Sequence, residues 1–420
     1  MIILLLVLLL ALLIGVYQKK IKNDWLNPIL VFTVPLIFSY LVYLFFYYKE
    51  YQISNKTAYI YCFGIISFLI GIFLSERNTI FKKDKKCMKD FKTIPINHNL
   101  DIFLYIFSIM IGFFLIINLI LVFINSGFSN VVFHIRYEAV YGTGVSPIIE
   151  YGMVIVSLYT YIKVYNYSIS TKKYKYQKRK ILILLTISFL NIFISMARTA
   201  IISLSLSLYY LYTFKDKKTY QNKKIKSMIK MYKNNLLIFL IILTIFYFIA
   251  YSTNRLGGAN FLDKNFFIYS YLGKQIMNFD KVILNFVNCG NGYYTFGFIG
   301  RFLNGLGVVN LLSFNDFFNS YSLIEQDGAV YSFVGPLYFD FGTIGVIISM
   351  IMNGIFVGFL YKKSNKHMGS WTILYTTCLY STFMSFFDYQ FMMSSQLYFI
   401  CLLIVLYIYN NNGKIIIKKG

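Results

Sequence analysis

The sequence contains little proline, tryptophan, histidine and charge. Of its 420 residues, 5 are Pro, 2 are Trp and 3 are His, and charged residues make up 13%. Because soluble domains carry about 25% charged residues, this composition excludes an ordinary soluble enzyme and a disordered tail protein. Acidic residues are also scarce: 16 Asp and Glu stand against 40 Lys and Arg, a formal net charge of +24. Such an excess indicates either nucleic-acid binding or a membrane protein with basic loops on one side.

Cysteine is present but not in a metal-binding pattern. The five cysteines are Cys62, Cys87, Cys289, Cys378 and Cys401, and none form a CxxC pair. A zinc knuckle is therefore not expected. The sequence also lacks a P-loop and the His/Asp spacing of a metal site. We therefore expect neither a metal nor another cofactor.

Long apolar runs dominate the chain. Hydrophobic residues make up 58% of it, and a helix needs about 20 apolar residues to cross a bilayer. We therefore predict an all-α polytopic membrane protein with about eleven transmembrane helices. The predicted spans are 1–17, 26–48, 57–74, 102–124, 147–166, 181–196, 200–214, 236–252, 342–361, 371–387 and 391–409.

The first run is expected to be a span and not a cleaved signal peptide. It has no basic segment before it and no small-residue cleavage site. Lys19, Lys20 and Lys22 follow it directly, as basic residues follow a span on its cytoplasmic side.

The basic residues lie on alternate loops. One set of loops holds 30 Lys and Arg residues and the other holds nine. The positive-inside rule makes the first set cytoplasmic, which places the N-terminus outside and the C-terminus in the cytoplasm. Because the basic runs are short and lie between spans, we expect contact with membrane lipids and no nucleic-acid partner. The cytoplasmic set is 18–25, 75–101, 167–180, 215–235, 362–370 and the tail from residue 410.

The predicted spans divide the chain into three parts. Residues 1–252 form an N-terminal membrane region of eight spans, 253–341 form one large external loop, and 342–420 form a C-terminal membrane region of three spans with a cytoplasmic tail. Within the loop, Phe261 to Val287 mixes aromatic and basic residues, which predicts one or two helices lying at the membrane interface. Loops of this length are usually functional. The alternative is a bent re-entrant connector.

Four arginines lie on the predicted outside: Arg136, Arg198, Arg255 and Arg301. The guanidinium group stays charged and matches phosphate oxygens with two parallel hydrogen bonds, so these residues are candidates for binding a diphosphate. Arg198 lies in a three-residue turn, 197–199, between two apolar runs. The alternative for Arg198 is a side chain that reaches out to lipid phosphates.

Acidic residues and one histidine add candidate bases on the same side. His134, Arg136 and Glu138 lie within five residues, as a base and an anion clamp would, or as one solvated helix face. Ten acidic residues lie outside or at the outer edge, among them Asp280 and Asp388.

The chain resembles the Wzy-type oligosaccharide repeat-unit polymerases, also called O-antigen or capsular polysaccharide polymerases. Residues 134–138 (HIRYE) resemble the first external arginine segment of that family. Residues 195–199 (SMART) resemble its serine/arginine/threonine turn between two tight spans. The segment from 328–332 (GAVYS) through 336–345 (PLYFDFGTIG) resembles its passage from the large external loop into the next span, and is the most specific of the three.

This resemblance implies a lipid-dependent, GT-C-like glycosyltransferase fold in the bacterial plasma membrane, with its active site outside. It implies transfer between glycans linked to undecaprenyl diphosphate, without a metal, and it makes a flippase and a chain-length regulator candidate partners. A base must accept the proton of the attacking hydroxyl. Glu325, Asp327 and His134 are the candidates, and Asp340 is a further one that can equally be a helix cap.

Two other functions remain open from the sequence. A lipid-linked oligosaccharide flippase also handles lipid diphosphates, but such transporters usually contain internal repeats, and none is found by inspection. An O-antigen ligase would share the architecture and differ in its acceptor.

Overall fold

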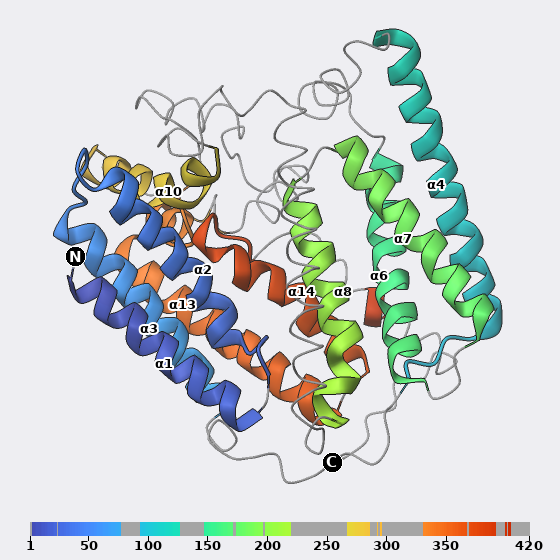
Figure 1. The fold of residues 1–420 in the computed structure, drawn as a ribbon, viewed down its shortest axis with the longest axis horizontal. Coiled ribbons are helices and arrows are strands. Elements are labelled where there is room, and N and C mark those ends of the chain that lie inside the picture. The colour runs from blue at the N-terminus through green and yellow to red at the C-terminus, as the bar shows by residue number, and fades with distance from the viewer. Residues whose placement is uncertain are drawn as a thin grey trace. The chain divides into compact units, whose positions relative to one another are not determined.

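The computed structural model is helical throughout the residues it describes (Figure 1). In these residues the one β-type pairing is an isolated bridge between Ser332 and Asp388. The prediction of an all-α protein is therefore confirmed for the described part of the chain. The described residues are 2–22, 24–76, 93–126, 147–170, 174–195, 198–219, 267–285, 292, 295, 331–367, 369–391, 400 and 402–404.

Five helices are long and apolar enough to cross a membrane, which supports a multi-pass membrane protein. Each coincides with a predicted span. They are α1 (Ile2–Lys22), α2 (Pro28–Val42) continued by the π-helix η1 (Tyr43–Tyr47), α3 (Asn55–Glu76), α4 (His98–Ser126) and α13 (Val334–His367).

Four further helices lie on predicted spans but do not meet the same length and composition limits. They are α6 (Pro147–Ile169), α7 (Lys175–Ser195), α8 (Arg198–Thr219) and α14 (Ser370–Phe383), the last followed by the 3-10 turn η3 (Met384–Phe386). The predicted spans 236–252 and, for the most part, 391–409 lie outside the described residues. The total of eleven spans stays a prediction.

The chain folds into two compact units that are each assembled from distant parts of the sequence. Unit 1 comprises Met1–Lys85, Gly257–Lys366 and Cys378–Ser394. Unit 2 comprises Lys86–Leu256, His367–Thr377 and Ser395–Gly420. Unit 1 therefore contains residues from each of the three parts predicted from the order of spans, 1–252, 253–341 and 342–420.

Helices α3 and α13 of unit 1 approach each other through glycines. A Cβ added to Gly71 would lie 2.2 Å from the carbonyl oxygen of Ile351, and one added to Gly354 would lie 2.3 Å from that of Phe68. Both neighbours are backbone atoms, which a side-chain rotation cannot move. Small residues allow this close approach of two membrane helices, where packing contacts provide the association energy.

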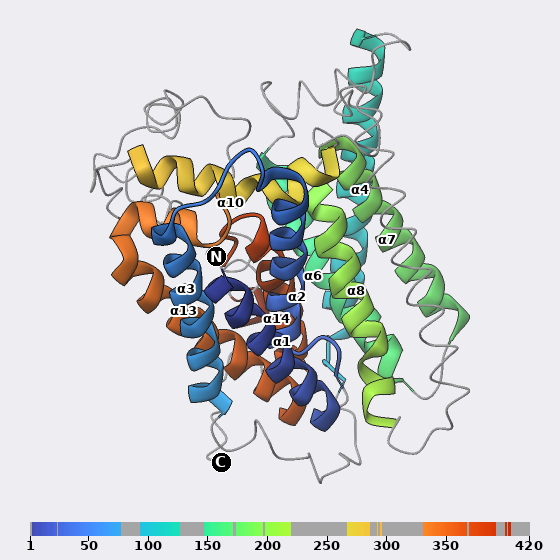
Figure 2. The same ribbon diagram turned by 60° about the vertical axis from the view of Figure 1, so that its left-hand side comes forward.

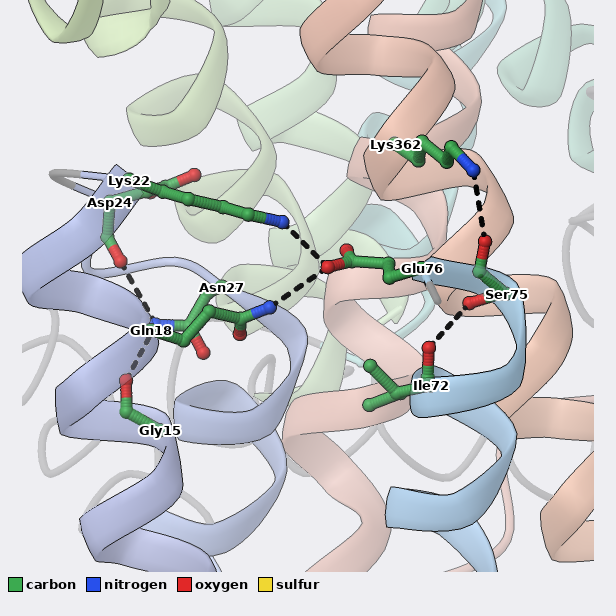
Figure 3. A network of polar contacts seen from close by, with 9 residues as sticks. All are labelled: Gly15, Gln18, Lys22, Asp24, Asn27, Ile72, Ser75, Glu76 and Lys362. Atoms are coloured by element: carbon green, nitrogen blue, oxygen red, sulfur yellow. Dashed lines mark hydrogen bonds and ion pairs between the residues drawn. The ribbon is translucent and has the colours of Figure 1, made fainter. Parts of the chain in front are cut away.

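A buried ion pair joins the C-terminal ends of α1 and α3 (Figure 3). Lys22 Nζ lies 2.6 Å from Glu76 Oε2, which also accepts a hydrogen bond from Gln18 Nε2 at 3.0 Å. Lys362, near the end of α13, donates to the carbonyl oxygen of Ser75 at 3.3 Å. The three helices thus run in the same direction. This agrees with the prediction that 18–25, 75–101 and 362–370 share one side of the membrane.

In unit 2, α4, α6 and α7 meet around Asp101. This carboxylate forms ion pairs with Lys163 and, at 3.7 Å, with Lys180, and it accepts a hydrogen bond from Tyr159 Oη at 2.8 Å. Lys163 is the basic residue that lies within the predicted span 147–166. The ion pair accounts for it, because a charge at the end of a span is stabilised by a partner.

Candidate functional site beneath helix α10

Helix α10 (Phe267–Asn285) lies across the ends of α2 and α3 in unit 1 (Figure 2). In the described part of the predicted interfacial segment, 261–287, the chain is helical, and its place at the membrane interface stays a prediction. All six residues from Gln275 to Asp280 are buried, and Leu284 is 60% exposed. The middle of α10 is therefore enclosed by its neighbours in unit 1.

Asp280 attaches α10 to the connection between η1 and α3. Its Oδ1 accepts hydrogen bonds from the backbone N–H of Ser54 at 3.0 Å and from Ser54 Oγ at 2.5 Å, and its Oδ2 accepts one from Tyr51 Oη at 2.8 Å. The side chain is 1% exposed. Burial and the bond to Asp280 raise the pKa of the Tyr51 phenol above its ordinary value. A carboxylate with three donors is well suited to hold a helix in place.

Aromatic rings fill the space below α10. The Phe279 ring lies 5.8 Å from that of Tyr61, 5.7 Å from that of Tyr338 and 6.1 Å from that of Phe339. Tyr61 also lies edge-on to Phe333 at 5.7 Å. Edge-to-face pairs of this kind add to the stability gained by burying the rings. They connect α10 and α3 to the first turns of α13.

Helix α13 is broken close to these rings. Gly342 has φ 65° and ψ −161°, so the chain leaves the helical conformation there and resumes it afterwards. Only glycine adopts this backbone conformation readily. Asp340, two residues before the break, is 2% exposed, and its Oδ2 accepts a hydrogen bond from the backbone N–H of Thr295 at 2.5 Å. Asp340 therefore fixes a point of the predicted external loop to the start of α13.

The backbone before α13 is strained and buried. Ser332 has φ 61°, a value uncommon for residues other than glycine. Its backbone N–H donates to the carbonyl oxygen of Phe387 at 3.0 Å, and its Oγ donates to that of Ser385 at 3.0 Å. These bonds hold the strained residue against the segment that follows α14. Strain of this kind is often found at functional sites.

Asp388, paired with Ser332 in the isolated bridge, is a third acid of the candidate site. It accepts hydrogen bonds from the backbone N–H of Tyr389 at 2.8 Å and from Gln390 Nε2 at 3.1 Å. Burial raises the pKa of the Asp388 carboxyl from its ordinary value to about 6. Since these two hydrogen bonds lower the pKa, loss of solvation is the larger effect.

Most residues proposed from the sequence lie outside the described part of the chain. They are the candidate bases Glu325, Asp327 and His134, the arginines Arg136, Arg255 and Arg301, and Glu138. Of the others, Asp340 is described above. Helix α7 ends at Ser195 and α8 begins at Arg198, so Arg198 is the first residue of a helix and does not lie in a turn as predicted. Residues 196–197, between the two helices, lie outside the described residues. The side chain of Arg198 also lies outside the described residues.

Three described residues of the site were not proposed from the sequence: Asp280, Ser332 and Asp388. Asp280 could have been predicted, because it is an acid on the apolar side of an amphipathic helix, where a buried partner is needed. No sequence pattern predicts a role for Ser332 or Asp388. Their importance depends on a contact between segments 56 residues apart in the sequence.

Comparison of the chain with protein-family models, with curated proteins and with solved structures finds no match. Within the described residues, no group of three or more His, Cys, Asp or Glu side chains is placed to hold a metal ion. The candidate site in unit 1 is thus defined by the buried acids Asp280 and Asp340, the partly buried Asp388, a layer of aromatic rings below α10 and a helix break.

Proposed function

We propose that the chain polymerises oligosaccharide repeat units linked to undecaprenyl diphosphate, at the outer face of the bacterial plasma membrane. The segment that most resembles the Wzy-type polymerases, 328–345, carries this proposal. Its described part, 331–345, contains Ser332, Asp340 and the break at Gly342, and its Tyr338 and Phe339 rings pack on Phe279 of α10. The resemblance and the unusual structure thus fall on the same residues.

The proposed reaction moves a glycan between two lipids. A hydroxyl oxygen of one repeat unit attacks the anomeric carbon of the other glycan and forms the new glycosidic bond. The bond from that carbon to the diphosphate breaks, and undecaprenyl diphosphate leaves with the electron pair. The proton of the hydroxyl passes to a base, for which Glu325, Asp327 and His134 remain the candidates. Fixed cations stabilise the leaving diphosphate, whose charge increases in the transition state.

Arg198 is the candidate arginine whose backbone the structure describes. It is the first residue of the 22-residue helix α8. The backbone N–H groups of the first turn of a helix have no partner within the helix and attract anions, as an arginine does. With the N-terminus outside, as the charge distribution predicts, this end of α8 faces the outer headgroups.

Deletion of the gene in its own host tests the proposal. We expect surface glycans that carry one repeat unit and show no ladder on a gel, and the ladder should return when the gene is restored. Loss of even single external units would instead indicate the flippase function. A normal ladder in the lipid-linked pool, not transferred to its final acceptor, would indicate the ligase function. Either result would contradict the proposal.

A further inference from the structure

Two buried polar side chains, one in α10 and one outside it, have no hydrogen-bond partner in the described part of the chain. Gln275 is 2% exposed, and neither its amide nitrogen nor its amide oxygen has a hydrogen bond. Thr295 is also 2% exposed, and its hydroxyl has none. Each such group lowers the stability of the fold, because it has lost its bonds to water and gained none in their place. A native chain that keeps these groups buried gains from them in another way, for example by contact with a ligand.

Both groups flank the same short segment, Tyr338–Asp340. Thr295 is held there because its backbone N–H donates to Asp340 Oδ2. Gln275 precedes Phe279 by four residues, which places both on one side of α10, and the Phe279 ring packs on those of Tyr338 and Phe339. The unpartnered groups therefore lie beside aromatic rings and a buried carboxylate.

From this arrangement we propose that Gln275 and Thr295 bind hydroxyl groups of the glycan during polymerisation. This inference rests on the proposed function and assigns these residues a part of the substrate. An amide can donate to one hydroxyl and accept from another, and the threonine hydroxyl can do both. Aromatic rings nearby suit the apolar faces of a sugar ring. These are the features of a site for a neutral polyhydroxylated ligand.

The charges near these residues favour the glycan over the diphosphate of the same substrate. The deeply buried charged groups of this region are the acids Asp280 and Asp340. The lysines Lys274 and Lys281 are only partly buried, and Lys56 is exposed. A diphosphate placed among buried carboxylates would be repelled, whereas a sugar hydroxyl can donate to them.

The test uses Gln275→Met and Thr295→Val, which keep the size of each side chain and remove its hydrogen-bonding groups. We expect each to reduce polymer in the native host by about threefold to tenfold, the factor for one lost neutral hydrogen bond. Removal of an unsatisfied buried group does not lower stability. The purified variants should therefore unfold at the same temperature as the wild type or higher. A decrease in stability that parallels the loss of polymer would indicate a structural role and overturn the proposal.

Gln177→Met is the matched control, because Gln177 of α7 also has an amide oxygen without a partner in the described residues but belongs to unit 2. It should leave the ladder unchanged. A ladder of wild-type intensity from both Gln275→Met and Thr295→Val would refute the assignment, whereas a normal ladder in the deletion strain would refute the proposed function itself. The two failures are therefore distinguishable.

Binding is measured with two probes on the purified full-length protein. The first is the repeat-unit oligosaccharide released by mild acid from the lipid-linked glycans of the deletion strain, and the second is inorganic pyrophosphate. The oligosaccharide should raise the unfolding temperature of the wild type but not that of Gln275→Met. Pyrophosphate should affect both proteins equally. Loss of the pyrophosphate effect in Gln275→Met, with the oligosaccharide effect retained, would assign the residue to the diphosphate and overturn the proposal.

Discussion

Replacement of Asp280 by alanine should detach α10 from unit 1. The change removes the hydrogen bonds from Ser54 N–H, Ser54 Oγ and Tyr51 Oη, and the carboxylate that accepts them is 1% exposed. Each donor left without a partner costs about 1–3 kcal/mol. Because Ser54 and Tyr51 are only partly buried, the lower part of this range applies, and we expect a loss of about 3–5 kcal/mol in all. For a chain of 420 residues, the unfolding temperature should then fall by about 3–6 °C.

The buried cysteines provide the assay. Cys62 and Cys378 are buried in unit 1 and form no disulfide, so a dye that fluoresces on reaction with a thiol reports when this unit opens. Serine replaces Cys87, Cys289 and Cys401 in the parent protein, so that the dye detects only the two buried residues. The unfolding temperature of Asp280→Ala is then compared with that of the parent in the same detergent.

Three variants separate the role of the hydrogen bonds from other effects. Asp280→Asn keeps an acceptor for Ser54 and can donate to Tyr51 Oη, so it should cost only about 1 kcal/mol. Tyr51→Phe combined with Asp280→Ala should cost less than the sum of the two changes, because they share one bond. Leu284→Ala, on the exposed side of α10, should have little effect. If Asp280→Ala unfolds at the same temperature as Leu284→Ala, Asp280 does not hold α10.

Three further predictions concern the helix contact, the pH dependence and the diphosphate. Gly354→Ala should prevent accumulation of folded protein, because its Cβ would lie 2.3 Å from the carbonyl oxygen of Phe68, whereas Ile348→Ala, at a residue 58% exposed, should accumulate normally on an immunoblot. The pKa of the Asp388 carboxyl is raised to about 6, so its contribution to stability is complete below pH 3.8 and is lost as the pH rises through 6. Asp388→Asn should therefore unfold at a higher temperature than the wild type at pH 7.5. An equal difference in unfolding temperature at pH 4 and at pH 7.5 would contradict this. Arg198→Lys should reduce polymer on the order of 10²–10³-fold at equal protein level, because lysine lacks the planar fork, and a wild-type ladder would show that Arg198 does not clamp the diphosphate.

The helices could be predicted from the sequence because they depend on local composition. Long apolar runs predicted α1 to α4, and the mixture of aromatic and basic residues in 261–287 predicted α10. The start of α13 was predicted less accurately. The predicted span began at residue 342, but the structure has helical turns from Val334, broken at Gly342. Pro336 is compatible with these turns because proline is tolerated in the first turn of a helix.

The contacts of the candidate site could not be predicted in the same way. Asp280 contacts Ser54, which lies 226 residues earlier, and Asp340 contacts Thr295, which lies 45 residues earlier. No local pattern specifies such pairs, because they depend on how α10 packs on the ends of other helices. The charge distribution predicted on which side of the membrane these acids lie, and the fold brings α10 to the strained segment around Ser332.

Polymerisation by the purified chain in lipid vesicles tests the central claim most directly. The vesicles contain the lipid-linked repeat units that accumulate in the deletion strain, and the products are separated by size and analysed for released undecaprenyl diphosphate. We expect glycans of increasing length, one lipid diphosphate released for each new bond, and no effect of a metal chelator. Repeat units that cross the membrane without growing in length, with no lipid diphosphate released, would contradict the claim.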